Sequence, residues 1–149
     1  MRRWTSPSRS PPTSRRRWAD AVATPYQLEF RGFGDELQVT IHGEERSPES
    51  ALAGWVRIAS EVRLRNATRL LAVSRVQGEP MQVEDMRGFF AGMGGLGMER
   101  VRVAYVDMEG LSAPLAQTAE TLAAEHGFSA RVFDNRAAAE LWLRHGSAR

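Results

Sequence analysis

Residues 92–107, GMGGLGMERVRVAYVD, hold the pattern that decides the fold of this chain. The first six match the G-x-G-x-x-G fingerprint of dinucleotide-binding domains, in which the glycines follow a strand and open a helix. Here they follow the apolar stretch FFAGM and precede RVRVAYVD (100–107), whose alternating Arg and Val predict a strand. Glycines in that order end a helix, and the carbonyls at a helix C-terminus repel phosphate. We therefore expect no nucleotide site.

Strand patterns also occur on both sides of this segment. YQLEFRGF (26–33) and ELQVTIHG (36–43) alternate polar and apolar residues, and Gly34-Asp35 between them indicates a tight turn. The two segments are therefore expected to form a hairpin. RLLAVSRV (69–76) and ARVFD (130–134) predict two further strands.

Helical patterns separate and follow the later strands. The first helix begins at the N-cap and proline pair Ser47-Pro48. Its expected core stripe is Leu52, Trp55, Val56, Ala59 and Val62. Further helices are expected from about Val83, over residues 112–125, and after Asp134, which we expect to cap the last one.

The resulting order is ββαβαβαβα. It predicts an α/β fold with a five-stranded mixed sheet, in which an N-terminal antiparallel hairpin is followed by parallel strands. Right-handed crossovers between sequential strands place the helices mainly on one face. Because Arg100 and Arg102 alternate with Val101 and Val103, the other face is expected to be largely exposed to water.

A family resemblance supports this architecture. ERVRVAYVD (99–107) followed by ARVFDNRAAAELWL (130–143) resembles the STAS-like superfamily, specifically the SpoIIAA-like proteins, over roughly residues 26–145. The resemblance implies a β-α superhelix and a cytoplasmic, non-catalytic binding or regulatory module. Anti-sigma-factor antagonists in this superfamily present a phosphorylatable serine in an Asp-Ser-Ser-Gly-type loop after the third strand. Here that loop, VQGEPMQVED, has no Ser or Thr, and Ser74 falls inside the predicted strand. The SpoIIAA-like branch has been linked to apolar ligands and membrane association.

The charge of the chain is unevenly distributed. Residues 1–23 contain six Arg and one acidic residue, whereas residues 24–149 contain 14 Arg and 17 acidic residues. The first segment is rich in Arg, Ser and Pro and is predicted to be a disordered tail, with one domain over 24–149. Because the domain itself is mildly acidic, we expect no nucleic-acid partner.

Few residues suggest catalysis or cofactor binding. The chain has no Cys, no G-x-S-x-G elbow and no P-loop. His126 and His145 precede glycines at predicted helix ends, and His42 lies on the polar side of a strand. We therefore expect no catalytic residue, cofactor or metal.

Polar residues follow the parallel strands, at the edge where open α/β sheets bind ligands. They include the loop 77–80, the pair Asp107 and Glu109 with Ser112, and Asp134-Asn135. These residues could contact a ligand or partner, or they could only end strands and cap helices.

Segment 86–98 combines Met86, Phe89, Phe90 and Met93 with five glycines. The apolar side chains could pack in the core, or they could form a mobile flap over an apolar pocket or a patch that contacts a protein partner or a membrane surface. No apolar run is long enough to span a membrane. The alternative function is therefore a peripheral carrier or sensor of an apolar ligand or membrane surface, gated by this segment.

Overall fold

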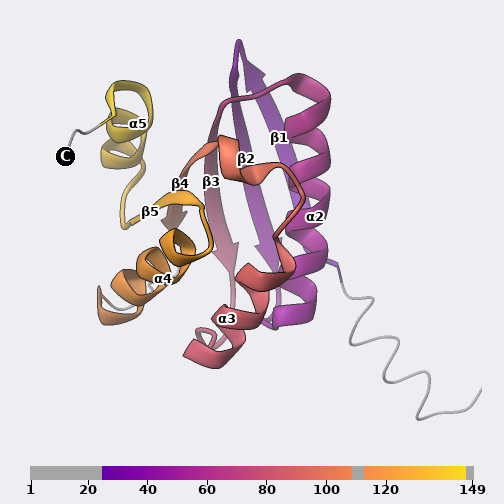
Figure 1. Cartoon of the computed structure of the whole chain (residues 1–149), viewed down its shortest axis with the longest axis vertical. Helices are drawn as coiled ribbons and strands as arrows, with labels where there is room; N and C mark the ends of the chain where they lie inside the picture. The colour runs from indigo at the N-terminus through magenta and orange to yellow at the C-terminus, as the bar shows by residue number, and fades with distance from the viewer. Residues whose placement is uncertain (1–24, 109–112, 147–149) are drawn as a thin grey trace, which may run out of the picture.

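Five strands form one sheet in the computed structural model, which describes residues 25–108 and 113–146. They lie in sequential order (Figure 1): β1 (Gln27–Phe33), β2 (Glu36–Gly43), β3 (Arg69–Val76), β4 (Arg102–Asp107) and β5 (Ser129–Phe133). β1 pairs with β2 antiparallel, and the other neighbours are parallel. The mixed α/β sheet expected from the sequence is thus confirmed. The tail 1–23, Glu109 and Ser112 lie outside the described residues.

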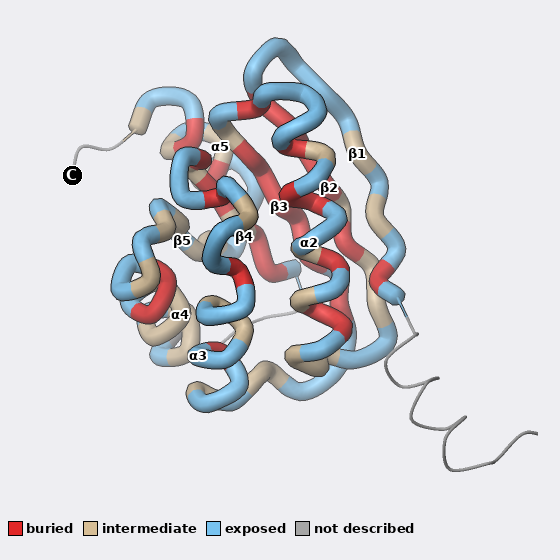
Figure 2. Tube along the Cα trace, turned by 45° about the vertical axis from the view of Figure 1, so that its right-hand side comes forward, coloured by how far each residue is buried: buried red, intermediate tan, exposed pale blue. Residues whose placement is uncertain are grey.

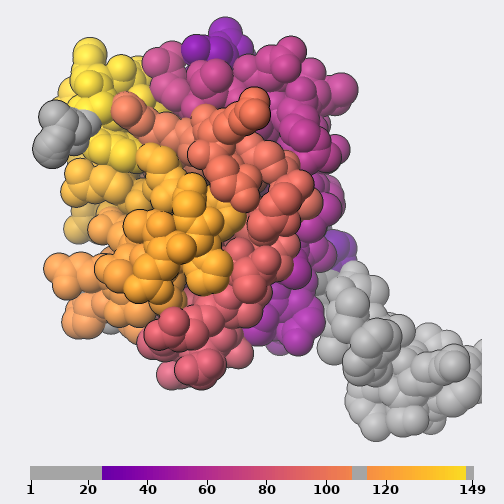
Figure 3. Space-filling view, viewed as in Figure 1, coloured from indigo at the N-terminus to yellow at the C-terminus, as the bar shows by residue number. Residues whose placement is uncertain are grey.

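Three helices cover one face of this sheet. They are α2 (Pro48–Arg65), α3 (Val83–Gly92) and α4 (Ala113–Glu125), each connecting two parallel strands. In the space-filling view, α3 and the segment between α3 and β4 lie beside α4 on this side of the molecule (Figure 3). α5 (Arg136–His145) packs on the opposite face. Helices mainly on one face were expected, and this is confirmed.

The core consists of two clusters separated by the sheet. We call the sheet face covered by α2, α3 and α4 the near face, and the face covered by α5 the far face. The larger cluster joins the near face to α2 and α3, and Figure 2 shows its buried residues along β2, β3 and the inner side of α2. Its most buried members are Leu37, Val39, Ile41, Ile58, Ala59, Leu70 and Ala72. The smaller cluster joins the far face to α5 and contains Leu71, Val73, Ala104, Val106, Ala139 and Leu143.

The expectation that the far face is largely exposed to water is wrong over β2, β3 and β4. α5 lies across it and buries Ala104 and Val106 against Leu143, so this part of the sheet is apolar on both faces. The same helix covers two polar residues of β2, Glu36 and Gln38, which are 4% and 8% exposed. Local alternation does not show this, because a polar residue in a strand can face either water or a helix that supplies hydrogen bonds.

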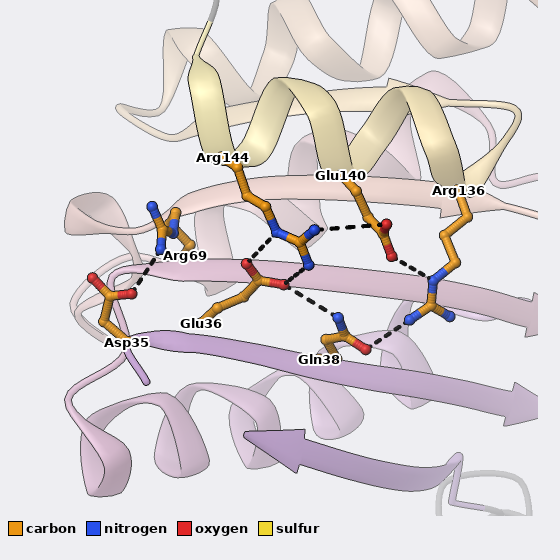
Figure 4. Close-up of polar contacts among 7 residues, drawn as sticks. All are labelled: Asp35, Glu36, Gln38, Arg69, Arg136, Glu140 and Arg144. Carbon is orange, nitrogen blue, oxygen red and sulfur yellow. Dashed lines mark hydrogen bonds and ion pairs between the residues drawn. The ribbon is translucent and has the colours of Figure 1, made fainter. Parts of the chain in front are cut away.

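A polar ladder joins α5 to β2 along the rim of the smaller cluster (Figure 4). Nε and Nη2 of Arg144 each donate to one carboxylate oxygen of Glu36, at 3.1 Å. Nε2 of Gln38 donates to the same carboxylate at 3.2 Å, while its Oε1 accepts from Arg136 at 2.6 Å. Burial by itself raises the pKa of Glu36, but the hydrogen bonds from Arg144 and Gln38 outweigh it, so this pKa lies below its ordinary value. The ladder keeps Glu36 charged beneath α5.

Among the predictions about the helices, one N-cap is confirmed, and a second N-cap and one core position need correction. The N-cap of α2 is Ser47, whose side chain accepts from the Ser50 amide as expected. The last helix is capped by Asn135, whose Oδ1 accepts from the Ala138 amide at 2.8 Å, and not by Asp134. Val56 is 43% exposed and does not belong to the core stripe of α2, where Ile58 is fully buried instead. Val56 and Ile58 are two positions apart, which places them on nearly opposite sides of a helix with 3.6 residues per turn, so only one of them can face the sheet.

The glycine-rich stretch ends α3, as the sequence predicts. α3 ends at Gly92, and β4 begins only after the short 3-10 helix η2 (Met98–Arg100). Gly95 and Gly97 have φ angles of 84° and 89°, a left-handed conformation that side chains disfavour. Leu96 between them is held to α2 by a 2.7 Å hydrogen bond from Arg63 to its carbonyl.

Candidate functional site

A cavity of about 160 Å³ lies between the near face of the sheet and helices α3 and α4. Its lining reaches Val76 and Asp107 at the carboxyl ends of two parallel strands, the edge at which open α/β sheets bind ligands. Most of its lining is apolar: Ile41, Ala51, Trp55, Val76, Met81, Met86, Phe89, Phe90, Met93, Met98, Val103, Ala119, Ala123, Phe128, Ala130 and Val132. Tyr26, Arg46, Ser74, Tyr105, Asp107 and Glu120 complete it.

The cavity unites two groups of residues that the sequence suggested separately. Met86, Phe89, Phe90 and Met93 line it from α3 and its C-cap, and Asp107 lines it from the end of β4. Met86 and Met93 are both 4% exposed, so they also belong to the core, whereas Phe89 and Phe90 are half-buried. Side chains of this segment therefore pack in the core and line the cavity at the same time.

Aromatic rings follow one another around the cavity. The ring of Trp55 lies 6.4 Å from those of Tyr105 and Phe89. Phe89 meets Phe90 edge-on at 5.1 Å, and Phe90 lies 6.1 Å from Phe128. These centroid distances are typical of favourable aromatic pairs. Side chains from α2, α3, β4 and the residue that precedes β5 thus form a continuous aromatic wall.

The polar end of the cavity is built around Arg46. This residue lies in the loop between β2 and α2, and its Nη2 is 3.1 Å from Oδ1 of Asp107. The guanidinium also donates to the carbonyls of Val76 at 2.8 Å and Gly78 at 3.2 Å. The side chains of Arg46 and Asp107 are 10% and 2% exposed. Loops that follow β2 and β3 are thereby tied to the end of β4.

Two tyrosines complete this polar end. Burial raises the pKa of Tyr105, and its hydrogen bonds with Ser74 and Arg46 only partly offset this effect. Burial also raises the pKa of Tyr26 to about 12. Its hydroxyl donates to the Glu45 carbonyl at 3.0 Å. Both phenols therefore stay protonated at neutral pH and can donate hydrogen bonds, but they do not act as bases.

Glu120 provides a carboxylate on the opposite side, from α4. Its Oε2 accepts from the Val132 amide on β5 at 2.8 Å. Within the described residues, β5 is an edge strand that pairs with β4 alone. Glu120 therefore satisfies an edge amide and places a negative charge beside the cavity, since Val132 lies opposite Tyr105 in the β4–β5 pairing.

The Ser74 hydroxyl lies beside the Tyr105 phenol in this lining. Ser74 is fully buried, and its Oγ accepts from the Val76 amide at 3.3 Å. The raised pKa of Tyr105 makes that phenol a poor general base for Ser74. Within residues 25–108 and 113–146, no group of three or more His, Asp or Glu side chains could hold a metal ion.

Sequence reasoning missed Arg46, Trp55, Tyr105 and Glu120 as parts of one site. Arg46 and Glu120 have no local signal, because an Arg in a loop and a Glu in a helix are ordinary surface residues by pattern. Trp55 was assigned only to the core stripe of its helix. A polar residue at the end of a buried strand was the one available signal, and it identified Asp107.

In the part of the chain that the structure describes, no helix is long and apolar enough to cross a membrane.

No family model matches this chain, and no curated protein matches it. Among solved structures, the chain is similar to an uncharacterized protein of the DUF3478 family with a SpoIIAA-like fold from Shewanella loihica PV-4. The sequences are 12% identical, the match covers 80% of this chain and 94% of the other, and the TM-score is 0.47. At this identity the likeness concerns the fold alone.

Proposed function

We propose that this protein is a non-catalytic binding module that holds a small apolar molecule in the cavity beneath α3. The observation that carries the proposal is the cavity of about 160 Å³ with its mostly apolar and aromatic lining. An engineered apolar cavity of about 150 Å³ in another protein stays dry and binds benzene. A ligand the size of one aromatic ring therefore fits here, while a complete lipid chain requires α3 to move.

α3 is suited to act as the gate of this cavity. Only Met86 among its ten residues is buried, and its N-cap Gln82 makes no side-chain capping bond. Two glycines, Gly88 and Gly92, lie within the helix, and each costs up to about 1 kcal/mol relative to Ala. Elements of low local stability commonly form the movable parts of ligand sites. We infer that ligand occupancy stabilises α3, so that the protein acts as a carrier or a sensor.

A phosphorylation switch is not part of this proposal. Ser74 is fully buried in β3, and the loop that follows has no Ser or Thr. We infer instead that any regulatory role operates through occupancy of the cavity, in the cytoplasm and without nucleic acid. Peripheral contact of α3 with a membrane surface is one route by which an apolar ligand would reach the cavity.

Titration of the full chain with toluene tests the proposal, with melting temperature and ligand-observed NMR as readouts. Binding raises the melting temperature, since the ligand binds the folded state alone. Ala119→Leu and Ala130→Leu each add bulk at a lining position, so both variants should lose toluene binding. Ala124→Leu makes the same change at an exposed position of α4 and should bind as the unmodified chain does.

The two filling variants lie on different elements, α4 and β5, so a folding defect in one leaves the other as a test. Failure of the unmodified chain to bind toluene would overturn the proposal. Toluene binding that both filling variants retain would place the ligand elsewhere and overturn it equally.

A further inference from the structure

We propose that the ligand of this cavity is a small cationic amine with an apolar body, an inference that rests on the proposed function. Neither an apolar cavity nor its volume distinguishes an amine from a hydrocarbon or a carboxylic acid. The charges and the aromatic rings of the lining make this distinction.

The described lining residues include three charged groups, Arg46, Asp107 and Glu120. Arg46 and Asp107 neutralise each other through their ion pair, with Nη2–Oδ1 and Nη1–Oδ2 distances of 3.1 and 3.3 Å. Glu120 leaves the described lining with a net negative charge. In a lining of low polarity this charge favours a cation and disfavours an anion.

Arg46 does not offer a site for a carboxylate. A guanidinium has five N–H donors. Those of Arg46 make four hydrogen bonds, to both oxygens of Asp107 and to the carbonyls of Val76 and Gly78. An anionic ligand would have to break part of this buried network, because the cation it needs is already committed.

Glu120, in contrast, keeps acceptor capacity. A carboxylate has two oxygens that can accept about four hydrogen bonds. The Val132 amide uses Oε2, at 2.8 Å. An ammonium group within the cavity can therefore donate to the same carboxylate without displacing this edge-strand bond, and charge-assisted hydrogen bonds are among the strongest in proteins.

The aromatic wall favours the same ligand class. Rings from Trp55, Phe89, Phe90, Tyr105 and Phe128 adjoin one another at centroid distances of 5.1 to 6.4 Å and line the cavity. The face of an aromatic ring is negative and attracts cations, and aromatic cages recognise ammonium groups in this way. His126 stacks on Phe90 at 6.1 Å but is not among the residues lining the cavity.

Three ring compounds of similar size test the inference on the full chain at neutral pH: benzylamine, toluene and benzoate. Benzylamine is expected to bind most tightly and benzoate most weakly, with about a tenfold difference or more between these two. Glu120→Gln keeps an acceptor for the Val132 amide and removes the charge. It should weaken benzylamine about tenfold and leave toluene unchanged.

Two further variants separate the charge from the rings. Glu125→Gln changes an exposed carboxylate of the same helix and should leave all three affinities unchanged. Phe90→Leu keeps the position apolar but removes the ring, so it should weaken benzylamine more than toluene. The inference would be overturned if toluene binds but benzylamine binds no more tightly than benzoate. It would also be overturned if Glu120→Gln leaves benzylamine binding unaffected. Either result would leave the proposed function standing. Failure of the unmodified chain to bind toluene would overturn the proposed function itself.

Discussion

The Arg46 guanidinium and the Asp107 carboxylate form a buried pair that joins the carboxyl ends of three neighbouring strands. Arg46 follows β2, Asp107 ends β4, and the carbonyl of Val76 at the end of β3 accepts from the same guanidinium at 2.8 Å. The pair thus closes the polar end of the cavity and holds the surrounding loops together. The stability of this ion pair and the shape of the cavity are therefore linked.

Removal of the Asp107 charge should destabilise the protein strongly. Asp107→Asn leaves the Arg46 guanidinium, 10% exposed, without its counter-charge. Breaking one side of a buried pair typically costs about 3–5 kcal/mol. Urea unfolding measures this loss. The control is Glu84→Gln, which removes the exposed Arg87–Glu84 contact of 4.0 Å. This substitution should change the free energy of unfolding by no more than about 0.5 kcal/mol. Equal losses in the two variants would show that the Arg46–Asp107 pair contributes no more than a surface contact.

Two leucines of α5 should differ sharply in their effect on stability. Leu143 is fully buried in the far-face cluster, whereas Leu141 is 63% exposed on the same helix. Leu143→Ala should lower the free energy of unfolding by about 2–5 kcal/mol, and Leu141→Ala by about 0.5 kcal/mol or less. Chemical denaturation of both variants measures the difference. If Leu143→Ala lowered the free energy of unfolding as little as Leu141→Ala does, α5 would not be docked on the sheet in solution.

The contribution of Glu36 to stability should depend on pH. Its folded pKa lies below the ordinary value of 4.5, so the charged form stabilises the fold. This contribution is fully present above pH 4.5 and is lost as the pH falls through the folded pKa. The free-energy difference between the unmodified chain and Glu36→Gln should therefore shrink at acidic pH. The double variant with Arg144→Met isolates the pair, and a coupling energy that stays constant with pH would contradict this origin.

Stiffening α3 should slow its opening. Gly88 is exposed within α3, and a Cβ built there meets no atom within 4 Å, so Gly88→Ala should stabilise the helix by about 0.5–1 kcal/mol. Gly97→Ala, at a φ of 89°, should instead cost about 1 kcal/mol. Hydrogen exchange gives the readout. Residues 86–98 should exchange faster than 103–106 in the unmodified chain, and more slowly with Gly88→Ala. If residues 86–98 of the unmodified chain exchanged as slowly as residues 103–106, the segment would be ordinary core.

The strands and helices follow from local pattern because a strand alternates every two residues and a helix repeats every 3.6. Val103 and Val106 in β4, and the Ser47-Pro48 start of α2, needed no distant information. The order of the glycines relative to α3 and β4 likewise identified them as a helix end. These features depend on neighbours within one turn or one strand.

The site depended on contacts that are distant in the sequence. Met86, Phe89, Phe90 and Met93 were recognisable as an apolar group and Asp107 as a polar residue at a strand end, but only the packing of α3 over the sheet unites them. Arg46 and Asp107 are 61 residues apart, and Arg144 and Glu36 are 108 apart. Periodicity indicates that a face is apolar or polar, but not which element covers it. The fold class could therefore be predicted from the chain alone, whereas the burial of Glu36 beneath α5 and the charge of the cavity required the folded arrangement, because burial is a property of elements packed against each other.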